Sequence, residues 1–220
     1  MKKTPVALLS LALLTSFTGT CHALTRVLIV GDSLSAAYGM PVEYGWVALL
    51  DARLQALGSD TTVINASISG ETSAGGLARL PALLEQHRPG IVVIELGGND
   101  GLRGYPVPQL RDNLLQMVRL SRAAGADVLL VGMRILPNYG KRYTEAFHQS
   151  FVDLAAQEQV PLVPFLLDGL TVSGEVLQSD GIHPTAAVQP MMLDNVWPTL
   201  ESLLAARQPQ TESDHAATDP

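Results

Sequence analysis

The chain has 220 residues, of which 47% are hydrophobic and 16% are charged, and its formal net charge is −7. The apolar share excludes a wholly disordered chain, and the length suits one domain with a full hydrophobic core. The acidic balance excludes a general nucleic-acid binder, because phosphate neutralisation needs clustered lysine and arginine. The one cysteine, Cys21, excludes an intramolecular disulfide framework and a thiolate zinc cluster.

The first 23 residues are predicted to be a signal peptide. Two lysines, Lys2 and Lys3, precede an apolar segment at 6–17 that is too short to span a membrane. Cleavage is expected after Ala23, which would place the mature protein in the periplasm or outside the cell. Two alternatives are an uncleaved anchor and a lipoprotein beginning at Cys21, although the residues before Cys21 fit a lipoprotein signal poorly.

Strands and helices are predicted to alternate five times along residues 24–207. The run 91–96 is apolar almost without alternation, as expected for a strand that is covered on both faces. The predicted strands are 26–30, 61–65, 91–96, 127–133 and 160–165. The predicted helices are 42–57, 74–87, 108–124, 142–158 and 185–206, with a possible kink or break at Pro81 in the second.

This alternation predicts an α/β fold, in which helices cover both faces of a parallel sheet. Right-handed crossovers leave few topologies, of which the flavodoxin-like strand order 2-1-3-4-5 is common. No linker divides the chain, so one domain is expected over 24–207. Residues 208–220 are polar and free of aromatic side chains, and we expect them to form a disordered tail.

Four polar segments follow predicted strands. They are expected to meet at one rim, because parallel strands end at the same edge of the sheet, and ligands bind beyond that edge. Ser33, after the first strand, is either a helix cap or a nucleophile. His183 is the candidate base for that nucleophile, since the other histidines fall on predicted helices or outside the predicted domain. Asp180 precedes His183 by three residues and either fixes its tautomer or serves as a turn residue.

Acyl transfer also needs hydrogen-bond donors for the oxyanion of the transition state. The backbone N–H groups of Ser33 and Gly70 and the side-chain amide of Asn99 are candidates on the same rim. Each has a plainer interpretation, because glycine is common in turns and asparagine often bonds within a loop. The hypothesis depends on the conjunction of the four segments at four strand ends.

Gly31-Asp32-Ser33-Leu34, Gly70, Gly98-Asn99-Asp100 and Asp180-x-x-His183 together resemble the four sequence blocks of the GDSL, or SGNH, hydrolases. The longer strings around these blocks are similar to the branch of bacterial periplasmic thioesterases, lysophospholipases and arylesterases. The resemblance implies a three-layer fold with a five-stranded parallel sheet. It also implies Ser33, His183 and Asp180 as catalytic triad, with Ser33, Gly70 and Asn99 forming the oxyanion hole.

We expect two segments, 101–107 and the region around 135–137, to border a groove for the acyl chain, as in the branch that the sequence resembles. The segment 101–107 could equally be a surface connection. The apolar candidates in them are Leu102, Tyr105, Ile135, Leu136 and Pro137. Four basic residues in or near these segments either meet an anionic head group or form a solvated face: Arg103, Arg134, Lys141 and Arg142.

The expected partner is a small-molecule ester or thioester, bound without a metal or other cofactor by a chain acting as a monomer. At most transient contact with membrane lipids is expected, and none with nucleic acid. Export favours lysophospholipids or exogenous esters over cytosolic acyl-CoA. A carbohydrate acetyl-esterase of the same fold is one rival, but Trp46 and Trp197 fall on predicted helices and are expected in the core. A flavodoxin-like module binding phosphate at Gly97-Gly98 is another, but it leaves Asp180 and His183 without a role.

Overall fold

The structure is a computed structural model that describes residues 24–170 and 176–207. The predicted signal peptide at 1–23 and the predicted tail at 208–220 lie outside the described residues. Within the described ranges, none of the helices is long and apolar enough to cross a membrane.

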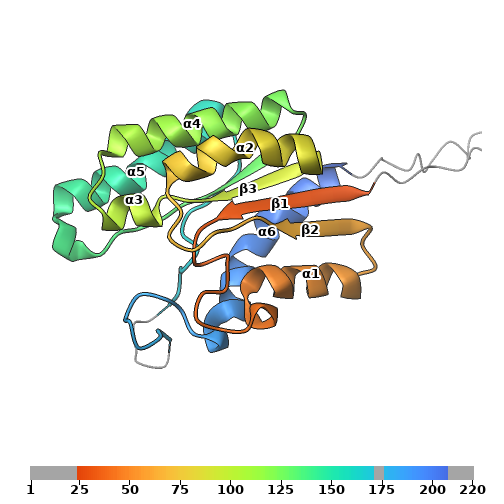
Figure 1. The fold of residues 1–220 in the computed structure, drawn as a ribbon, viewed down its shortest axis with the longest axis horizontal. Coiled ribbons are helices and arrows are strands. Elements are labelled where there is room, and N and C mark those ends of the chain that lie inside the picture. The colour runs from red at the N-terminus through yellow and green to blue at the C-terminus, as the bar shows by residue number, and fades with distance from the viewer. Residues whose placement is uncertain (1–23, 171–175, 208–220) are drawn as a thin grey trace, which may run out of the picture.

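A parallel sheet of five strands forms the centre of the molecule, in the order β2-β1-β3-β4-β5. Figure 1 labels β2, β1 and β3, which lie between the helical layers. The predicted α/β class and strand order are therefore confirmed. All the strands run in one direction, so their carboxyl ends lie at the same edge of the sheet. The strands are β1 Thr25–Gly31, β2 Thr61–Asn65, β3 Ile91–Glu95, β4 Asp127–Val131 and β5 Leu162–Val163.

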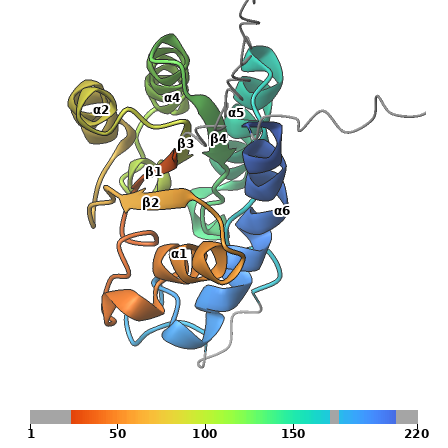
Figure 2. The ribbon, with the colours of Figure 1, turned by 90° about the vertical axis from the view of Figure 1, so that its right-hand side faces the viewer.

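Helices cover both faces of the sheet and give three layers (Figures 1 and 2). One face carries α2 Ser73–His87, α4 Val107–Ala123 and α5 Lys141–Glu158. The other carries α1 Trp46–Ala56 and α6 Gln189–Arg207. The short elements are α3 Gly98–Leu102 and the 3-10 turns η1 Val42–Tyr44, η2 Pro137–Tyr139 and η3 Ala186–Val188.

Successive side chains of β1 explain why its residues 27–30 are apolar without alternation. Leu28 and Val30 lie in the cluster beneath α2, α4 and α5, whereas Val27 and Ile29 lie in the cluster beneath α1 and α6. All four side chains are fully buried. A strand between two helical layers has no face for polar residues, which is the pattern that the sequence shows.

The predicted helix over 42–57 is interrupted at Gly45, whose backbone is extended with φ −69° and ψ 149°. A side chain at Gly45 would meet the Ala37 Cβ at 2.7 Å, so the close approach requires glycine. The Trp46 N–H that opens α1 donates to the Gln189 side chain at 3.0 Å. Tertiary contacts thus divide the segment with helical spacing of apolar residues into a 3-10 turn and a helix.

The last predicted strand is shorter than expected, and it pairs with β4 only at Leu162 and Val163. Pro161 and Pro164 flank these two residues. Proline has no N–H to donate to a sheet, so pairing stops on both sides. By contrast, Pro81 does not end α2, which continues from Ser73 to His87.

The sequence pattern predicts no helix between β3 and the helix that begins near residue 108, but residues 98–102 form α3. Its sequence Gly-Asn-Asp-Gly-Leu has weak helix propensity. The buried carboxylate of Asp100 accepts hydrogen bonds from the Ser73 N–H at 2.8 Å and the Ser73 hydroxyl at 2.5 Å. This tertiary anchor to the start of α2 explains the helix.

Candidate active site

The four polar segments meet at the carboxyl edge of the sheet, as the sequence predicts. Ser33 leaves β1 in a tight turn that is closed by the Ala36 N–H donating to the Asp32 carbonyl at 3.0 Å. Asn99 lies on α3 directly after β3. His183 lies on a segment whose Leu177 forms a β-bridge with Pro184, and its carbonyl accepts the Gln178 N–H at 2.7 Å.

Ser33, His183 and Asp180 form a continuous hydrogen-bonded chain. His183 Nε2 lies 2.9 Å from Ser33 Oγ, and His183 Nδ1 lies 2.6 Å from Asp180 Oδ2. An ionised Asp180 only accepts, so Nδ1 carries the proton and Nε2 is left to accept from the serine hydroxyl. The His183 side chain is 19% exposed and so is reachable from solvent.

The Asp180 carboxylate is held in its ionised form mainly by backbone groups. The N–H groups of His183 and Ile182 donate to its Oδ1 at 3.0 and 2.9 Å. These two bonds, followed by the bond to the imidazole, lower the pKa of Asp180 to about 2. A carboxylate in this position is suited to stabilise a positively charged His183.

The amide of Asn99 connects two of the rim segments. Its Nδ2 donates to the carbonyl of Glu71 at 2.9 Å and to Asp32 Oδ2 at 3.2 Å. Gly70 precedes Glu71 and has a φ of +80°, a conformation that glycine adopts without strain. The candidate oxyanion donors thus come from segments that are hydrogen-bonded to one another.

An apolar cavity of about 440 Å³ opens beside Ser33 and His183. Three of the predicted groove residues line it: Leu102, Ile135 and Leu136. Tyr105 and Pro137 are not among its lining residues. The Tyr105 carbonyl instead accepts the Tyr143 hydroxyl at 2.8 Å, and Pro137 opens η2.

The opposite wall of this cavity was missed by sequence reasoning. It is supplied by the connection between β5 and α6, with Phe165, Leu167, Leu170, Val176 and Leu177. The available signal was the apolar run that follows the carboxyl end of the last strand. That run resembles ordinary core, so only the fold distinguishes a cavity wall from buried packing.

The four basic candidates have different surroundings. Arg134 lines the cavity and stacks over the Phe165 ring, with 5.2 Å from Cζ to the ring centroid. Arg103 donates to the Gly70 carbonyl at 3.1 Å. Lys141 pairs with Glu145 at 3.6 Å, and its neighbour Arg142 is also exposed.

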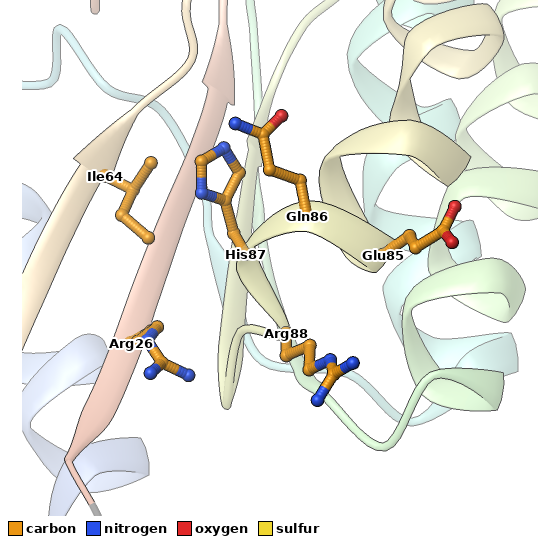
Figure 3. A pocket seen from close by; sticks show the side chains of 6 residues that line it. All are labelled: Arg26, Ile64, Glu85, Gln86, His87 and Arg88. Atoms are coloured by element: carbon orange, nitrogen blue, oxygen red, sulfur yellow. The ribbon is translucent and has the colours of Figure 1, made fainter.

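His87 and His148 do not reach Ser33. His148 lies on α5 with Nδ1 3.3 Å from the Met133 carbonyl. His87 ends α2 and lines a separate cavity of about 370 Å³ towards the amino edge of the sheet (Figure 3). The other residues lining that cavity are Arg26, Ile64, Glu85, Gln86 and Arg88.

Within residues 24–170 and 176–207, no group of three or more histidine, cysteine or acidic side chains is arranged to hold a metal ion.

Comparison with known proteins now identifies the family, since residues 29–189 match the GDSL-like Lipase/Acylhydrolase family. The chain belongs to this family. The GDSL-like match spans most of the chain and includes Ser33, Asn99, Asp180 and His183. The prediction of an ester or thioester hydrolase is thereby confirmed at the level of the enzyme class.

Three relatives illustrate the likeness. The Esterase TesA of Pseudomonas aeruginosa is 57% identical over 182 residues, which cover 83% of this chain and 90% of the relative. The Thioesterase 1/protease 1/lysophospholipase L1 of Escherichia coli K12 is 47% identical, with coverage of 83% and 86%. The structure of the psychrotrophic esterase EstA from Pseudoalteromonas sp., inhibited by monoethylphosphonate, is 44% identical, with a TM-score of 0.79 and coverage of 82% and 99%.

Proposed function

We propose that this GDSL-family hydrolase cleaves carboxylic esters and thioesters by two-step acyl transfer at Ser33. Ser33 Oγ attacks the carbonyl carbon while His183 Nε2 takes the hydroxyl proton. His183 then donates that proton to the leaving alcohol or thiol. Water attacks the acyl-serine with His183 again as base, which releases the acid and restores Ser33. The observation that carries the proposal is the Ser33–His183–Asp180 chain at the wall of an apolar cavity.

The oxyanion is proposed to accept hydrogen bonds from the N–H groups of Ser33 and Gly70 and from Asn99 Nδ2. The support is the contact of Asn99 with both segments, through Asp32 and Glu71. One of those two bonds has to be exchanged for the oxyanion, because an amide nitrogen carries only two protons. Loss of one such donor typically costs about 3 kcal/mol of transition-state stabilisation.

The proposed substrates carry a medium or long acyl chain: lysophospholipids, aryl and fatty acyl esters, and acyl-CoA. The support is the cavity lining, which is mainly aliphatic and includes Leu102, Ile135 and Leu136. The names of two relatives, an esterase and a thioesterase and lysophospholipase, are consistent with this range. Apolar contacts contribute about 0.8 kcal/mol for each buried methylene, so affinity should rise with chain length until the cavity is full.

The export signal at 1–23 is proposed to place the enzyme in the periplasm or outside the cell, where lysophospholipids and exogenous esters are available. The proposed working form is a monomer whose contact with membrane lipids is transient. The proposal of export is supported by the sequence pattern of the first 23 residues. Mass spectrometry of the mature amino terminus tests the cleavage after Ala23, and a lipidated Cys21 would contradict it.

The mechanism is tested by Ser33→Ala with Ser202→Ala as control, since Ser202 lies on the exposed side of α6. Hydrolysis of p-nitrophenyl esters should fall by at least about ten-thousandfold in the first variant and remain unchanged in the second. Covalent labelling by a phosphonate ester should disappear only with Ser33. Full activity or retained labelling in Ser33→Ala would end the proposal.

The substrate class is tested by kcat/KM for p-nitrophenyl esters of increasing chain length. The apolar cavity predicts a rise beyond acetate and a maximum at a longer chain. A maximum at acetate without long-chain activity would favour the carbohydrate acetyl-esterase. That rival has little structural support, since Trp46 is fully buried and Trp197 packs against the same cluster. A complete absence of hydrolysis would favour a binding module.

A further inference from the structure

A buried polar cluster lies directly beneath the turn that carries Ser33. It consists of Asp32, Ser35 and Glu95, whose residues are 2%, 1% and 0% exposed. Glu95 is the last residue of β3 and is paired with Gly31, the last residue of β1. A fully buried carboxyl group at this place is costly unless it makes hydrogen bonds, so its contacts need an explanation.

Glu95 contacts the turn on both sides of Ser33. Its Oε2 accepts the Ser35 hydroxyl at 2.6 Å and the Asp32 N–H at 3.3 Å. The approach is so close that a Cβ at Gly31 would lie 2.6 Å from the same oxygen. The glycine that begins the turn is therefore required by Glu95 beneath it and by Ser35, whose Cβ would lie 2.8 Å from a Cβ at Gly31.

Asp32 continues this connection to the candidate oxyanion donor. Its Oδ1 accepts the Leu34 N–H at 3.0 Å, and its Oδ2 accepts the Asn99 amide at 3.2 Å. The Glu71 carbonyl is a second acceptor for the same amide nitrogen. Because both neighbours are acceptors, Asn99 must turn its nitrogen, and not its oxygen, towards this part of the site.

We propose that Glu95 is a positioning residue for acyl transfer: it holds the Ser33 turn from below and, through Asp32, sets the turn against Asn99. The inference rests on the proposed role of Ser33 as nucleophile. Glu95 touches no reacting atom, so it acts by fixing the geometry between nucleophile and oxyanion donor. Such geometry matters because a misplacement of about 1 Å can reduce a rate by about a hundredfold.

The electrostatics of the cluster agree with a neutral Glu95 beside an ionisable Asp32. Burial, followed by the nearby Asp32 charge, raises the pKa of Glu95 well above its ordinary value. Its Oε1 has no hydrogen-bond partner among the described residues, so Oε2 is the atom that makes the contacts. A neutral carboxyl group and a glutamine side chain have the same shape and offer the same oxygen acceptor, which allows a sharp test.

The test compares Glu95→Gln and Glu95→Ala in kcat, KM and the rate of inactivation by a phosphonate ester. Glu95→Gln should retain kcat within about threefold, because the amide oxygen can accept from Ser35 and Asp32. Glu95→Ala should lose about tenfold to a hundredfold in kcat and in inactivation rate, with KM changed less than about twofold. Thermal unfolding measures the accompanying loss of stability.

Val93→Ala is the matched control. Val93 lies two residues earlier on the same face of β3 and is fully buried, yet it belongs to the apolar cluster under α1 and α6. It should lower the melting temperature without lowering kcat. Equal losses of kcat in Glu95→Ala and Val93→Ala, or in Glu95→Ala and Glu95→Gln, would overturn the inference. Failure of the Ser33 mechanism is separate, because it appears as activity that survives Ser33→Ala.

Discussion

At the residue scale, two aspartates near Ser33 have opposite pKa shifts for physical reasons that the structure makes visible. The pKa of Asp180 is lowered to about 2, chiefly by the backbone N–H groups of His183 and Ile182. The pKa of Asp32 is raised to about 6, chiefly by burial. The hydrogen bond from the Leu34 N–H and the nearby His183 act in the opposite direction and lower it. Asp180 therefore stays ionised throughout the neutral range, whereas Asp32 gains its charge within it.

The raised pKa of Asp32 predicts a pH-dependent effect of Asp32→Asn on stability. The folded pKa of about 6 exceeds the ordinary value of 3.8, so ionising Asp32 destabilises the folded state as pH rises from about 4 to above 6. Asparagine removes this charge. The free energy of unfolding of the variant, taken relative to wild type, should therefore be more favourable at pH 8 than at pH 5 by about 1–2 kcal/mol, which the melting temperatures at the two pH values measure.

The control for this measurement is Asp112→Asn, at an exposed position on α4. Its difference from wild type should be the same at both pH values. An equal difference at pH 5 and pH 8 for Asp32→Asn, or a larger one at pH 5, would contradict the assignment of a buried charge to Asp32.

At the element scale, the segment between α3 and α4 is held by side chains from distant elements. The Tyr139 hydroxyl donates to the Leu102 carbonyl and the Tyr143 hydroxyl to the Tyr105 carbonyl, each at 2.8 Å. The Arg103 guanidinium reaches the Gly70 carbonyl at 3.1 Å. The segment that begins at the cavity-lining Leu102 is thus fixed by hydrogen bonds at Leu102, Arg103 and Tyr105, and Leu102 forms part of one cavity wall.

Removing the two tyrosine hydroxyls should loosen this wall. In the double variant Tyr139→Phe and Tyr143→Phe, two hydrogen bonds of about 1 kcal/mol each are lost. Hydrogen exchange of the amides at 102–105 should become about fivefold to twentyfold faster. KM for long-chain esters should rise, with little change for acetate, because Leu102 lines the cavity.

Tyr44→Phe, which removes an exposed hydroxyl on η1, is the control for the loosened wall. It should leave both the exchange rates and the KM values unchanged. Unaltered exchange at 102–105 in the double variant would show that the two hydroxyls do not hold this segment.

At the scale of the whole molecule, one sheet separates two apolar clusters and takes part in both. Neighbouring residues Leu28 and Ile29 of β1 are fully buried on opposite faces. Trp46 lies within the cluster of α1 and α6, and Trp197 packs against it. Tryptophan fluorescence therefore reports on one layer, while circular dichroism reports on all the helices.

Leu28→Ala and Ile29→Ala should each lower the free energy of unfolding by about 2–5 kcal/mol, because each leaves a cavity in a packed core. Both variants should shift a single unfolding transition in urea, because the two apolar clusters share one sheet and so neither can unfold without the other. The decisive case is Leu28→Ala, which lies away from both tryptophans. A shift seen by circular dichroism but not by fluorescence would mean that the layers unfold separately.

Much of the fold was predictable because hydrophobic patterning acts locally. The apolar runs 27–30 in β1 and 91–94 in β3 are typical of strands covered on both faces, and the polar residues after the strands marked the rim. The same reasoning missed α3, whose helix depends on Asp100 bonding to Ser73 across the fold. It also overextended β5, which ends where proline removes the N–H donors.

The sequence by itself determined the α/β class and the residues that were to meet at the rim, and it reduced the strand order to a few alternatives, of which the predicted one is observed. Those properties follow from alternating apolar segments and from the rule that parallel strands end at one edge. Only the tertiary structure decided which apolar residues line the cavity and which are core, because both have the same composition. It alone placed Glu95 beneath Ser33, since that contact joins two strands that are distant in sequence and adjacent in the sheet.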